Sequence, residues 1–384
     1  MPVVTYLFLA LGLAALAYQL LALAALAWFM RTSLPSSFSP KGPGVTLLKP
    51  VRGVDADTHG CLTSFLRQNY GGPLQVLFGV ANPQDPVVPL LKDLQASHPQ
   101  ADIDIIICGQ TLGLNPKIST LRQLEPQARY DYLIISDSDI KVGADYLQQV
   151  VGALNQPEVG LVTCPYRAGP VRSWGAALEA LSISADFIPS VAMAYYVEGI
   201  NFGLGATLAL SRQVLAEIGG LAPLADYLAD DYQLGHRVAQ LGYRVHLLPY
   251  VVETHTSKQS WRGYLAHQLR WARTYRVCRP KGYFAYGITH ALVFALLTWL
   301  ASGMALWATG LLISTLIVRL FLAYGSEHLF LHGRLPWPYL ALLPLKDLLS
   351  FGLWMLSFLG DRVNWQGEFY RVTPSGQLVR ITQP

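Results

Sequence analysis

Two carboxylates separated by one small residue, Asp137 and Asp139, directly follow a short apolar run in the sequence YLIISDSDIK (132–141). A carboxylate pair at this spacing supplies the oxygen ligands that hard divalent cations prefer. Mg²⁺ in particular is commonly held by one or two carboxylates together with substrate phosphates. The same pair could instead form a turn or cap the next helix. The residues around it must decide between a divalent-metal site and a structural loop.

Two other stretches carry charged residues that could act together with this pair. Lys117 follows Asn115 and Pro116 in GLNPKISTL, a loop position where a lysine faces either solvent or a bound anion. Asp230 and Asp231 precede the helical pattern YQLGHRVAQLG, and carboxylates at a helix N-terminus are favourable in themselves. Taken singly, each of these motifs is compatible with a purely structural role.

A third stretch, SWRGYLAHQLRWARTYRVCR, contains His267, Arg270 and Trp271 and is apolar on one face and basic on the other. A helix of this kind lies well in a membrane interface, which would account for the tryptophan and the arginine together. We therefore predict an amphipathic interfacial helix over residues 258–280.

The elements that must position these residues form an α/β pattern between residues 44 and 255. Short apolar runs that alternate with helical patterns predict strands at 45–50, 74–80, 102–108, 130–136 and 159–164. Continuous apolar strands with intervening helices indicate a mostly parallel, Rossmann-like sheet covered on both faces. Such sheets bind ligands at the carboxyl ends of their strands, and Asp137 lies at one of these ends.

The composition indicates a membrane protein. Hydrophobic residues make up 52% of the 384 residues and charged residues only 14%, against about 25% charged in an ordinary soluble domain. Residues 3–30 carry no charge and exceed the roughly 20 residues that cross a bilayer. No lysine or arginine precedes this run, so we interpret it as an uncleaved anchor rather than a signal peptide.

Basic residues after the anchor place the following segment on the cytoplasmic side; they are Arg31, Lys41, Lys49 and Arg52. Further apolar blocks predict a transmembrane hairpin over 286–323 and a transmembrane or re-entrant segment over 336–359, followed by a tail over 360–384. The apolar stretch 174–205 is interrupted by charges and a proline. We expect it to lie against the bilayer as the portion that binds the acceptor.

Two classes of site are disfavoured by the sequence. The net charge of +4 comes without a basic run or interleaved aromatic residues, so we expect no nucleic-acid partner. The four cysteines show no C-x-x-C pairing, which disfavours both a zinc site and a disulfide framework.

Taken in order, the motifs resemble the family-2 nucleotide-sugar glycosyltransferases of GT-A fold over about residues 45–280. The sequence LLKPVRGVD leads to a helix that contains Ser64, Gln68 and Tyr70, and GLNPKI, the D-x-D pair, ADDY and HQLRW follow in the family's order. Within this group the chain is most similar to the ceramide glucosyltransferase family. The membrane anchor before the domain and the apolar segments after it match as well.

The resemblance implies a membrane-bound inverting hexosyltransferase that moves a sugar, glucose in the first place, from a UDP-sugar to a hydroxyl of a ceramide-like membrane lipid. It also implies roles for single residues. Asp137 and Asp139 would hold Mg²⁺ or Mn²⁺, Asp231 would be the general base, and Arg270 would stabilise the leaving diphosphate. Donor contacts are expected from Pro50, Asn82, Asp85, Lys117 and Asp137, and the box His267, Arg270 and Trp271 would close over the acceptor and the leaving group.

The chain departs from the family pattern at two positions. Asn82 stands where the family has its first aspartate, and His267 stands where its box begins with Gln or Arg. A glycosyltransferase that acts on a hopanoid or a diacylglycerol is an alternative on the same scaffold. A non-catalytic membrane scaffold is another, which Asn82 mildly favours and the retained Asp231 and Arg270 disfavour. We expect a multi-pass protein with its catalytic domain on the cytoplasmic face of a bacterial inner membrane.

Overall fold

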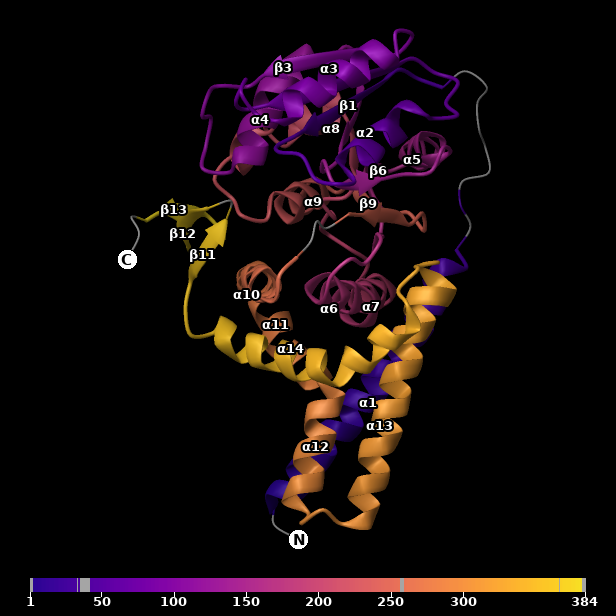
Figure 1. Ribbon diagram of the computed structural model, residues 1–384, viewed down its shortest axis with the longest axis vertical. Helices are drawn as coiled ribbons and strands as arrows, with labels where there is room; N and C mark the ends of the chain where they lie inside the picture. The colour runs from indigo at the N-terminus through magenta and orange to yellow at the C-terminus, as the bar shows by residue number, and fades with distance from the viewer. Residues whose placement is uncertain (1–2, 33, 35–41, 256–258, 366, 382–384) are drawn as a thin grey trace.

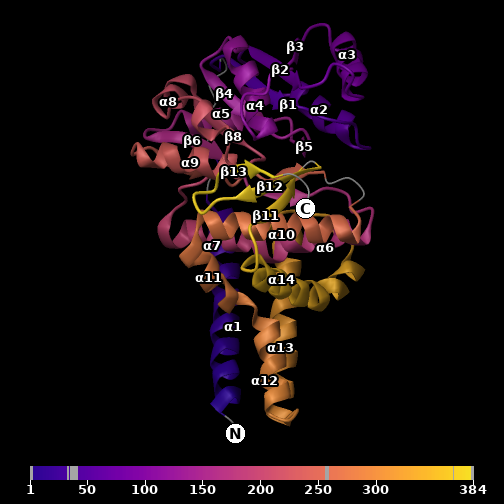
Figure 2. The ribbon, with the colours of Figure 1, turned by 90° about the vertical axis from the view of Figure 1, so that its left-hand side faces the viewer.

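A computed structural model describes residues 3–32, 34, 42–255, 259–365 and 367–381 (Figure 1). Lys41, and residue 258 at the predicted start of the interfacial helix, lie outside the described residues. The molecule has an α/β domain at one end, a layer of helices beneath it, and a stem of apolar helices at the other end (Figures 1 and 2).

The α/β domain is built on a seven-stranded sheet in the order β3-β2-β1-β4-β8-β6-β9. Its pairs β3-β2, β2-β1, β1-β4 and β6-β9 are parallel, and only β8 runs antiparallel to its neighbours. The mostly parallel sheet is thus confirmed. The strands are β1 (Val45–Pro50), β2 (Leu74–Val80), β3 (Asp102–Ile107), β4 (Tyr132–Ile135), β6 (Val159–Thr163), β8 (Leu208–Ser211) and β9 (Arg244–Leu247).

Helices and a second, small sheet complete this domain. The helices are α2 (Thr58–Leu66), α3 (Val87–Ser97), α4 (Pro116–Leu124), α5 (Tyr146–Leu154), α8 (Arg212–Glu217) and α9 (Asp230–Gln240). The small sheet joins β5 (Ile140–Lys141), β10 (Val252–Thr254) and β7 (Tyr166–Ala168). Its strand β5 directly follows the D-x-D pair, so this pair lies between the two sheets.

The stem consists of α1 (Val3–Met30), α12 (Ala291–Ala301) and α13 (Leu306–Tyr324), which run side by side away from the domain (Figures 1 and 2). Near the far end, Oγ1 of Thr5 donates a hydrogen bond to the carbonyl of Ala301 at 3.0 Å. In the described part of the chain, four helical segments are long and apolar enough to cross a membrane. A fifth is obtained if the bent pair Pro280–Thr289 and Ala291–Ala301 is one span.

The layer between domain and stem contains α6 (Trp174–Ser182), a π-helix (Ile183–Phe187), α7 (Ile188–Glu198), α10 (Trp261–Cys278), α11 (Pro280–Tyr286) and α14 (Leu343–Ser357). Segment Trp174–Glu198 is one of the four apolar candidates, but 78% of its most apolar window is buried inside the protein. α14 lies across the top of the stem (Figure 1). This burial favours the interpretation of 174–205 as a segment that does not cross the bilayer.

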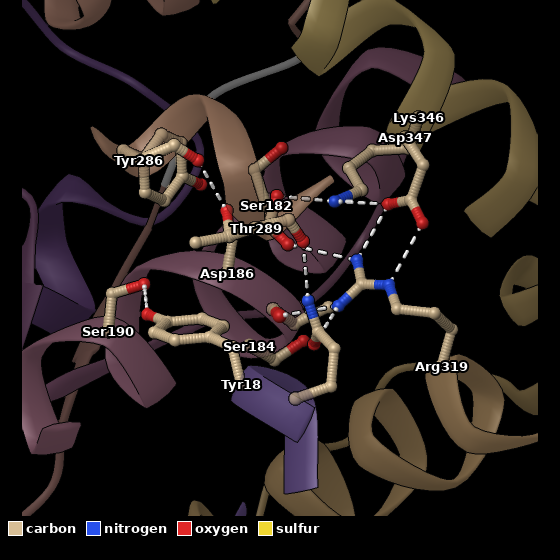
Figure 3. Close-up of polar contacts among 12 residues, drawn as sticks. Tyr18, Ser182, Ser184, Asp186, Ser190, Tyr286, Thr289, Arg319, Lys346 and Asp347 are labelled. Atoms are coloured by element: carbon tan, nitrogen blue, oxygen red, sulfur yellow. Dashed lines mark hydrogen bonds and ion pairs between the residues drawn. The ribbon is translucent and has the colours of Figure 1, made fainter. Parts of the chain in front are cut away.

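A buried ion cluster holds this layer to the stem (Figure 3). The guanidinium of Arg319 in α13 lies 2.6 Å from Asp347 of α14 and 2.9 Å from Asp186 of the π-helix. Lys346 pairs with the same two carboxylates, and Gln19 of α1 accepts a hydrogen bond from Arg319 at 2.9 Å. The two cations and two carboxylates therefore balance, as buried charges require.

The C-terminal segment forms a small sheet that packs against the α/β domain. The sequence predicts only a tail over residues 360–384. Strands β11 (Arg362–Trp365), β12 (Glu368–Val372) and β13 (Leu378–Arg380) form an antiparallel sheet. The amide of Leu378 donates to the carbonyl of Asp226 at 2.7 Å, and that of Leu228 donates to Gly376 at 3.3 Å. The tail thus braces the loop that leads into Asp230 and Asp231.

Candidate active site

The two carboxylates of the D-x-D pair have different surroundings. The Asp137 side chain is 38% exposed, and its Oδ1 lies 2.7 Å from Nζ of Lys117. Oδ2 of Asp139 accepts a hydrogen bond from Oγ1 of Thr254 at 3.1 Å. Burial, together with the neighbouring charge of Asp137, raises the pKa of Asp139. A cation bound here would stabilise the ionised form of Asp139, because it would offset the negative charge of the two carboxylates.

Lys117 lies between carboxylates from two separate segments. Asn115 caps α4 by accepting from the amide of Ile118 at 3.1 Å, which places Lys117 in the first turn. Its Nζ is 2.7 Å from Asp137 and 3.2 Å from Asp230. Burial lowers the pKa of the Lys117 amine, but the carboxylates raise it by more, and the net shift is upward. The lysine therefore stays charged.

Asp231 lies in the first turn of α9 and faces the same charged residues, Lys117 and Asp137. Its Oδ2 accepts from the amide of Gly205 at 2.9 Å, and its Oδ1 accepts from the amide of Tyr232 at 2.7 Å. Burial raises the pKa of Asp231 to about 6; Asp230 adds to the shift and Lys117 opposes it. A carboxyl group with this pKa can accept a proton near neutral pH.

Gly205 shows how close these charged groups lie. A Cβ atom at this position would be 3.0 Å from Oδ2 of Asp137, 3.4 Å from Oδ2 of Asp231 and 3.6 Å from Nζ of Lys117. The fold thus brings together three residues that the sequence singles out in separate motifs. Any side chain at position 205 would crowd these groups, so glycine lets the backbone approach them closely.

The donor set fits a divalent cation only in part. No group of three or more His, Cys, Asp or Glu among the described residues is arranged to hold a metal ion. Two carboxylates are nevertheless enough for Mg²⁺ when substrate phosphates complete the coordination. The raised pKa of Asp139 is compatible with such an ion. Asp137 and Asp139 as its ligands stay a prediction.

Pro50 is the last residue of β1, and Asn82 and Asp85 lie in the loop after β2. β1 pairs in parallel with β4, with Leu48 opposite Ile135, so Pro50 comes out at the same edge as the D-x-D pair. Oδ1 of Asp85 accepts from the amide of Gly53 at 2.9 Å and so ties the loop after β2 to the loop after β1. Asn82 is exposed and caps its own turn. Their roles in donor binding stay predictions.

Lys49 is a further candidate residue of the active site. The sequence analysis did not identify it as such and named it only as a basic residue after the anchor. It is fully buried in β1, and its Nζ donates to the carbonyl of Asp137 at 2.6 Å and to Oγ of Ser136 at 3.3 Å. Burial lowers the pKa of Lys49 to about 7, which the charge of Asp137 opposes. The available signal was a lysine inside an otherwise apolar strand.

The residues of the HQLRW box lie on α10 and face α6. Nδ1 of His267 is 3.1 Å from Oε1 of Glu179, a residue of α6 that is 1% exposed. Gln268 donates to the other oxygen of Glu179 at 3.0 Å. The Trp271 ring packs between His267 and Phe187, with centroids 4.6 and 5.7 Å away. The sequence analysis did not assign a role to Glu179.

Arg270 is the cation of this box that has no fixed partner. In the described part of the chain its guanidinium forms no salt bridge, although the charges of Glu179, Asp231 and Asp230 act on it. Burial lowers the pKa of Arg270, and these carboxylates oppose the shift. An unpaired guanidinium in a partly dry environment is a suitable partner for an anion such as a diphosphate.

This sheet, with an acidic pair at its carboxyl edge, has the GT-A fold. A mannosyltransferase from Pyrobaculum calidifontis, solved in complex with GDP-Man and Mn²⁺, aligns with a TM-score of 0.53 and 19% identity. The alignment covers 93% of this chain and 98% of that one. The chain belongs to glycosyl transferase family 21, whose family model matches residues 4–378.

Curated relatives agree with this membership. Ceramide glucosyltransferase 3 of Caenorhabditis elegans is 22% identical over 359 residues, which are 88% of this chain and 74% of the relative. Ceramide glucosyltransferase 1 of the same organism is 25% identical over 58% of this chain and 46% of its own length. A ceramide glucosyltransferase of Candida albicans is 35% identical over 29% of this chain and 23% of its own.

Proposed function

We propose that this protein is a membrane-bound, inverting glycosyltransferase that moves a sugar, glucose in the first place, from a UDP-sugar to a hydroxyl of a ceramide-like lipid. The observation that carries the proposal is the convergence of Lys117, Asp137 and Asp231 around Gly205. The names of the relatives support a glucosyl donor and a ceramide acceptor.

In this proposal each charged residue has one task. Asp231 accepts the proton of the acceptor hydroxyl as that oxygen attacks the sugar, and its pKa of about 6 leaves it ionised at neutral pH. Lys117 and Arg270 stabilise the negative charge that develops on the leaving diphosphate. Mg²⁺ or Mn²⁺ held by Asp137 and Asp139 would neutralise further diphosphate charge, and Pro50, Asn82 and Asp85 would line the donor side.

Inversion follows from this assignment of roles. No second carboxylate is assigned as a nucleophile toward the sugar, so the hydroxyl displaces the diphosphate directly. An α-linked donor then gives a β-linked glycolipid.

The arrangement of helices supports an integral, multi-pass protein. The stem of α1, α12 and α13 would cross the bilayer, and α14 would lie at its surface (Figure 1). The α/β domain would then face the cytoplasm, at the inner membrane if the host is a bacterium. The segment Trp174–Glu198 would lie just above the lipid, where an acceptor could reach Asp231 without leaving the bilayer.

The test uses membranes that contain the full-length protein. They are incubated with labelled UDP-glucose, UDP-galactose or UDP-N-acetylglucosamine and with ceramide, diacylglycerol or a hopanoid, with and without EDTA. We expect EDTA-sensitive transfer of glucose to ceramide. Transfer to another lipid alone would overturn the ceramide assignment, and no sugar transfer to any lipid would favour a non-catalytic scaffold.

A further inference from the structure

A small cluster of apolar side chains lies apart from the main core of the α/β domain. Its buried members are Leu228, Val363, Tyr370, Val372 and Leu378. All but the first belong to the C-terminal sheet, which consists of β11, β12 and β13. The partly buried residues that pack against the cluster are Leu114, Val277 and Trp365. Segments that are far apart in the sequence thus meet the C-terminal sheet at one place.

Each of these segments leads to a part of the proposed active site. Leu114 precedes the first turn of α4, which contains Lys117. Leu228 precedes the first turn of α9, which contains Asp231. Val277 lies in α10, the helix of the HQLRW box. The C-terminal sheet therefore contacts all three segments that carry these proposed charged groups.

Asp226 connects the C-terminal sheet to the loop before α4. Its carbonyl accepts a hydrogen bond from the amide of Leu378 at 2.7 Å, and the amide of Leu228 donates to the carbonyl of Gly376 at 3.3 Å. On its other side, Oδ1 of Asp226 accepts from the amide of Leu114 at 2.8 Å. The backbone of Asp226 thus binds the sheet, and its carboxylate binds the loop.

Asn115 joins the same two loops. Its backbone amide donates to the carbonyl of Ala225 at 2.8 Å. Its side-chain amide donates to the carbonyl of Tyr227 at 2.9 Å and to Oδ1 of Asp230 at 3.2 Å. Since Nζ of Lys117 is 3.2 Å from Oδ2 of Asp230, a shift of either loop would change the position of the lysine relative to α9.

The helix α10 is attached to the start of the C-terminal sheet. The guanidinium of Arg276 donates to the carbonyl of Gly360 at 3.0 Å, and that of Arg273 donates to the carbonyl of Arg362. The sheet lies between the levels of α9 and α10 (Figures 1 and 2). One small sheet is thus bound to α10 and, through Asp226, to both loops.

We propose that the C-terminal sheet is a clamp that positions Lys117, Asp231 and Arg270 relative to one another, and that Asp226 is its positioning residue. The inference rests on the proposed function, in which these three groups act together during transfer. It goes beyond that function by giving a role in catalysis to strands that carry no residue of the proposed mechanism. A misplacement of about 1 Å can cost about 10²-fold in rate.

The decisive variant is Asp226→Ala, which leaves the amide of Leu114 without this acceptor. Asp226 is exposed, so the exchange opens no cavity in the core. Asp226→Asn also removes the charge but keeps an acceptor oxygen. With the full-length protein in membranes and saturating substrates, we expect kcat to fall about tenfold in Asp226→Ala and to be largely restored in Asp226→Asn. KM for UDP-glucose should change much less than kcat in both variants, because groups that act in the transition state are misplaced.

A second measurement needs no substrate. Tyr370→Ala removes a ring from the apolar cluster, whereas Tyr370→Phe keeps it. Hydrogen exchange of the full-length protein reports local opening. In Tyr370→Ala we expect residues 112–118 and 225–234 to exchange about tenfold faster, with no change over residues 45–80. Arg380→Ala, which breaks an exposed pair with Glu368 in the same sheet, should change neither exchange nor kcat.

The outcomes are distinct. Unchanged kcat in Asp226→Ala would overturn the inference, and so would an equal loss in Asp226→Asn, which keeps the acceptor. Faster exchange in Tyr370→Ala that is confined to residues 360–381 would show that the sheet only covers the surface. Tyr370→Ala carries the kinetic test if Asp226→Ala does not accumulate. A wild type that transfers no sugar to any lipid would refute the proposed function, whereas the exchange measurement would still decide whether the sheet positions the two loops.

Discussion

Asp231→Asn is the perturbation that tests the mechanism most directly. The exchange keeps the size of the side chain but removes its ability to accept the acceptor proton. A general base contributes typically 10²–10⁴-fold to rate, and each tenfold corresponds to about 1.4 kcal/mol in the barrier. We therefore expect kcat to fall by two to four orders of magnitude, or about 3–5 kcal/mol.

The fold should survive this exchange. Both oxygens of Asp231 accept backbone amides, those of Gly205 and Tyr232. Asparagine offers one acceptor oxygen, so one amide loses its partner at a cost of about 1–3 kcal/mol. Typical domains are stable by about 5–15 kcal/mol. The variant should therefore remain folded and bind UDP-glucose with close to normal affinity, because Lys117 and Asp137 are unchanged.

The assay follows labelled transfer to ceramide at saturating donor, with donor binding measured separately. Asp230→Asn is the matched control; it removes an ion pair to Lys117 and should weaken donor binding while keeping turnover. If Asp231→Asn instead loses donor binding and keeps turnover, Asp231 is a ligand of the nucleotide and the base lies elsewhere.

Further predictions concern pH, the metal, the stereochemistry and the stem. Since Asp231 must be ionised and its pKa is about 6, kcat/KM should be constant above that pH and fall as the pH drops through it; a flat profile down to pH 5 would contradict the assignment. Alanine at Asp137 or at Asp139 should abolish transfer and donor binding in a folded protein, whereas EDTA-insensitive activity would exclude the metal. The NMR coupling constant of the product's anomeric proton should indicate a β-glycoside, and that of an α-glycoside would refute direct displacement. Arg319→Ala removes one of the two cations that balance Asp186 and Asp347, leaves one buried negative charge unbalanced, and should destabilise the protein in detergent by about 3–5 kcal/mol; Arg380→Ala, which breaks an exposed pair, should cost less than about 1 kcal/mol.

The sequence predicted the sheet and part of the site for reasons that the structure makes clear. Continuous apolar runs stopped by proline or glycine are characteristic of buried parallel strands, and β1 and β2 have the predicted bounds. Asp137 follows the end of β4, and Lys117 and Asp231 lie in the first turns of α4 and α9. Such positions meet at one edge of a parallel sheet. Together with the resemblance to a glycosyltransferase family, this order indicated that they act at one site.

Lys49, Glu179 and the C-terminal sheet were not accessible in this way. Lys49 contacts Ser136, 87 residues away, and Glu179 contacts Gln268, 89 residues away. Contacts across such separations leave no periodic signal in the sequence. The C-terminal strands were read only as a tail, because their short alternation does not reveal that they dock onto the loop before Asp230.

The ion cluster around Arg319 also sets an order for the assembly of the nascent chain. An arginine in an apolar helix is costly to bury unless a counter-ion pairs with it. Asp186 is synthesised 133 residues before Arg319, whereas Asp347 follows it by 28 residues. Asp186, the first counter-ion available to Arg319, thus comes from the segment beneath the catalytic domain, which is already translated at this point. Asp347 of α14 provides the second counter-ion.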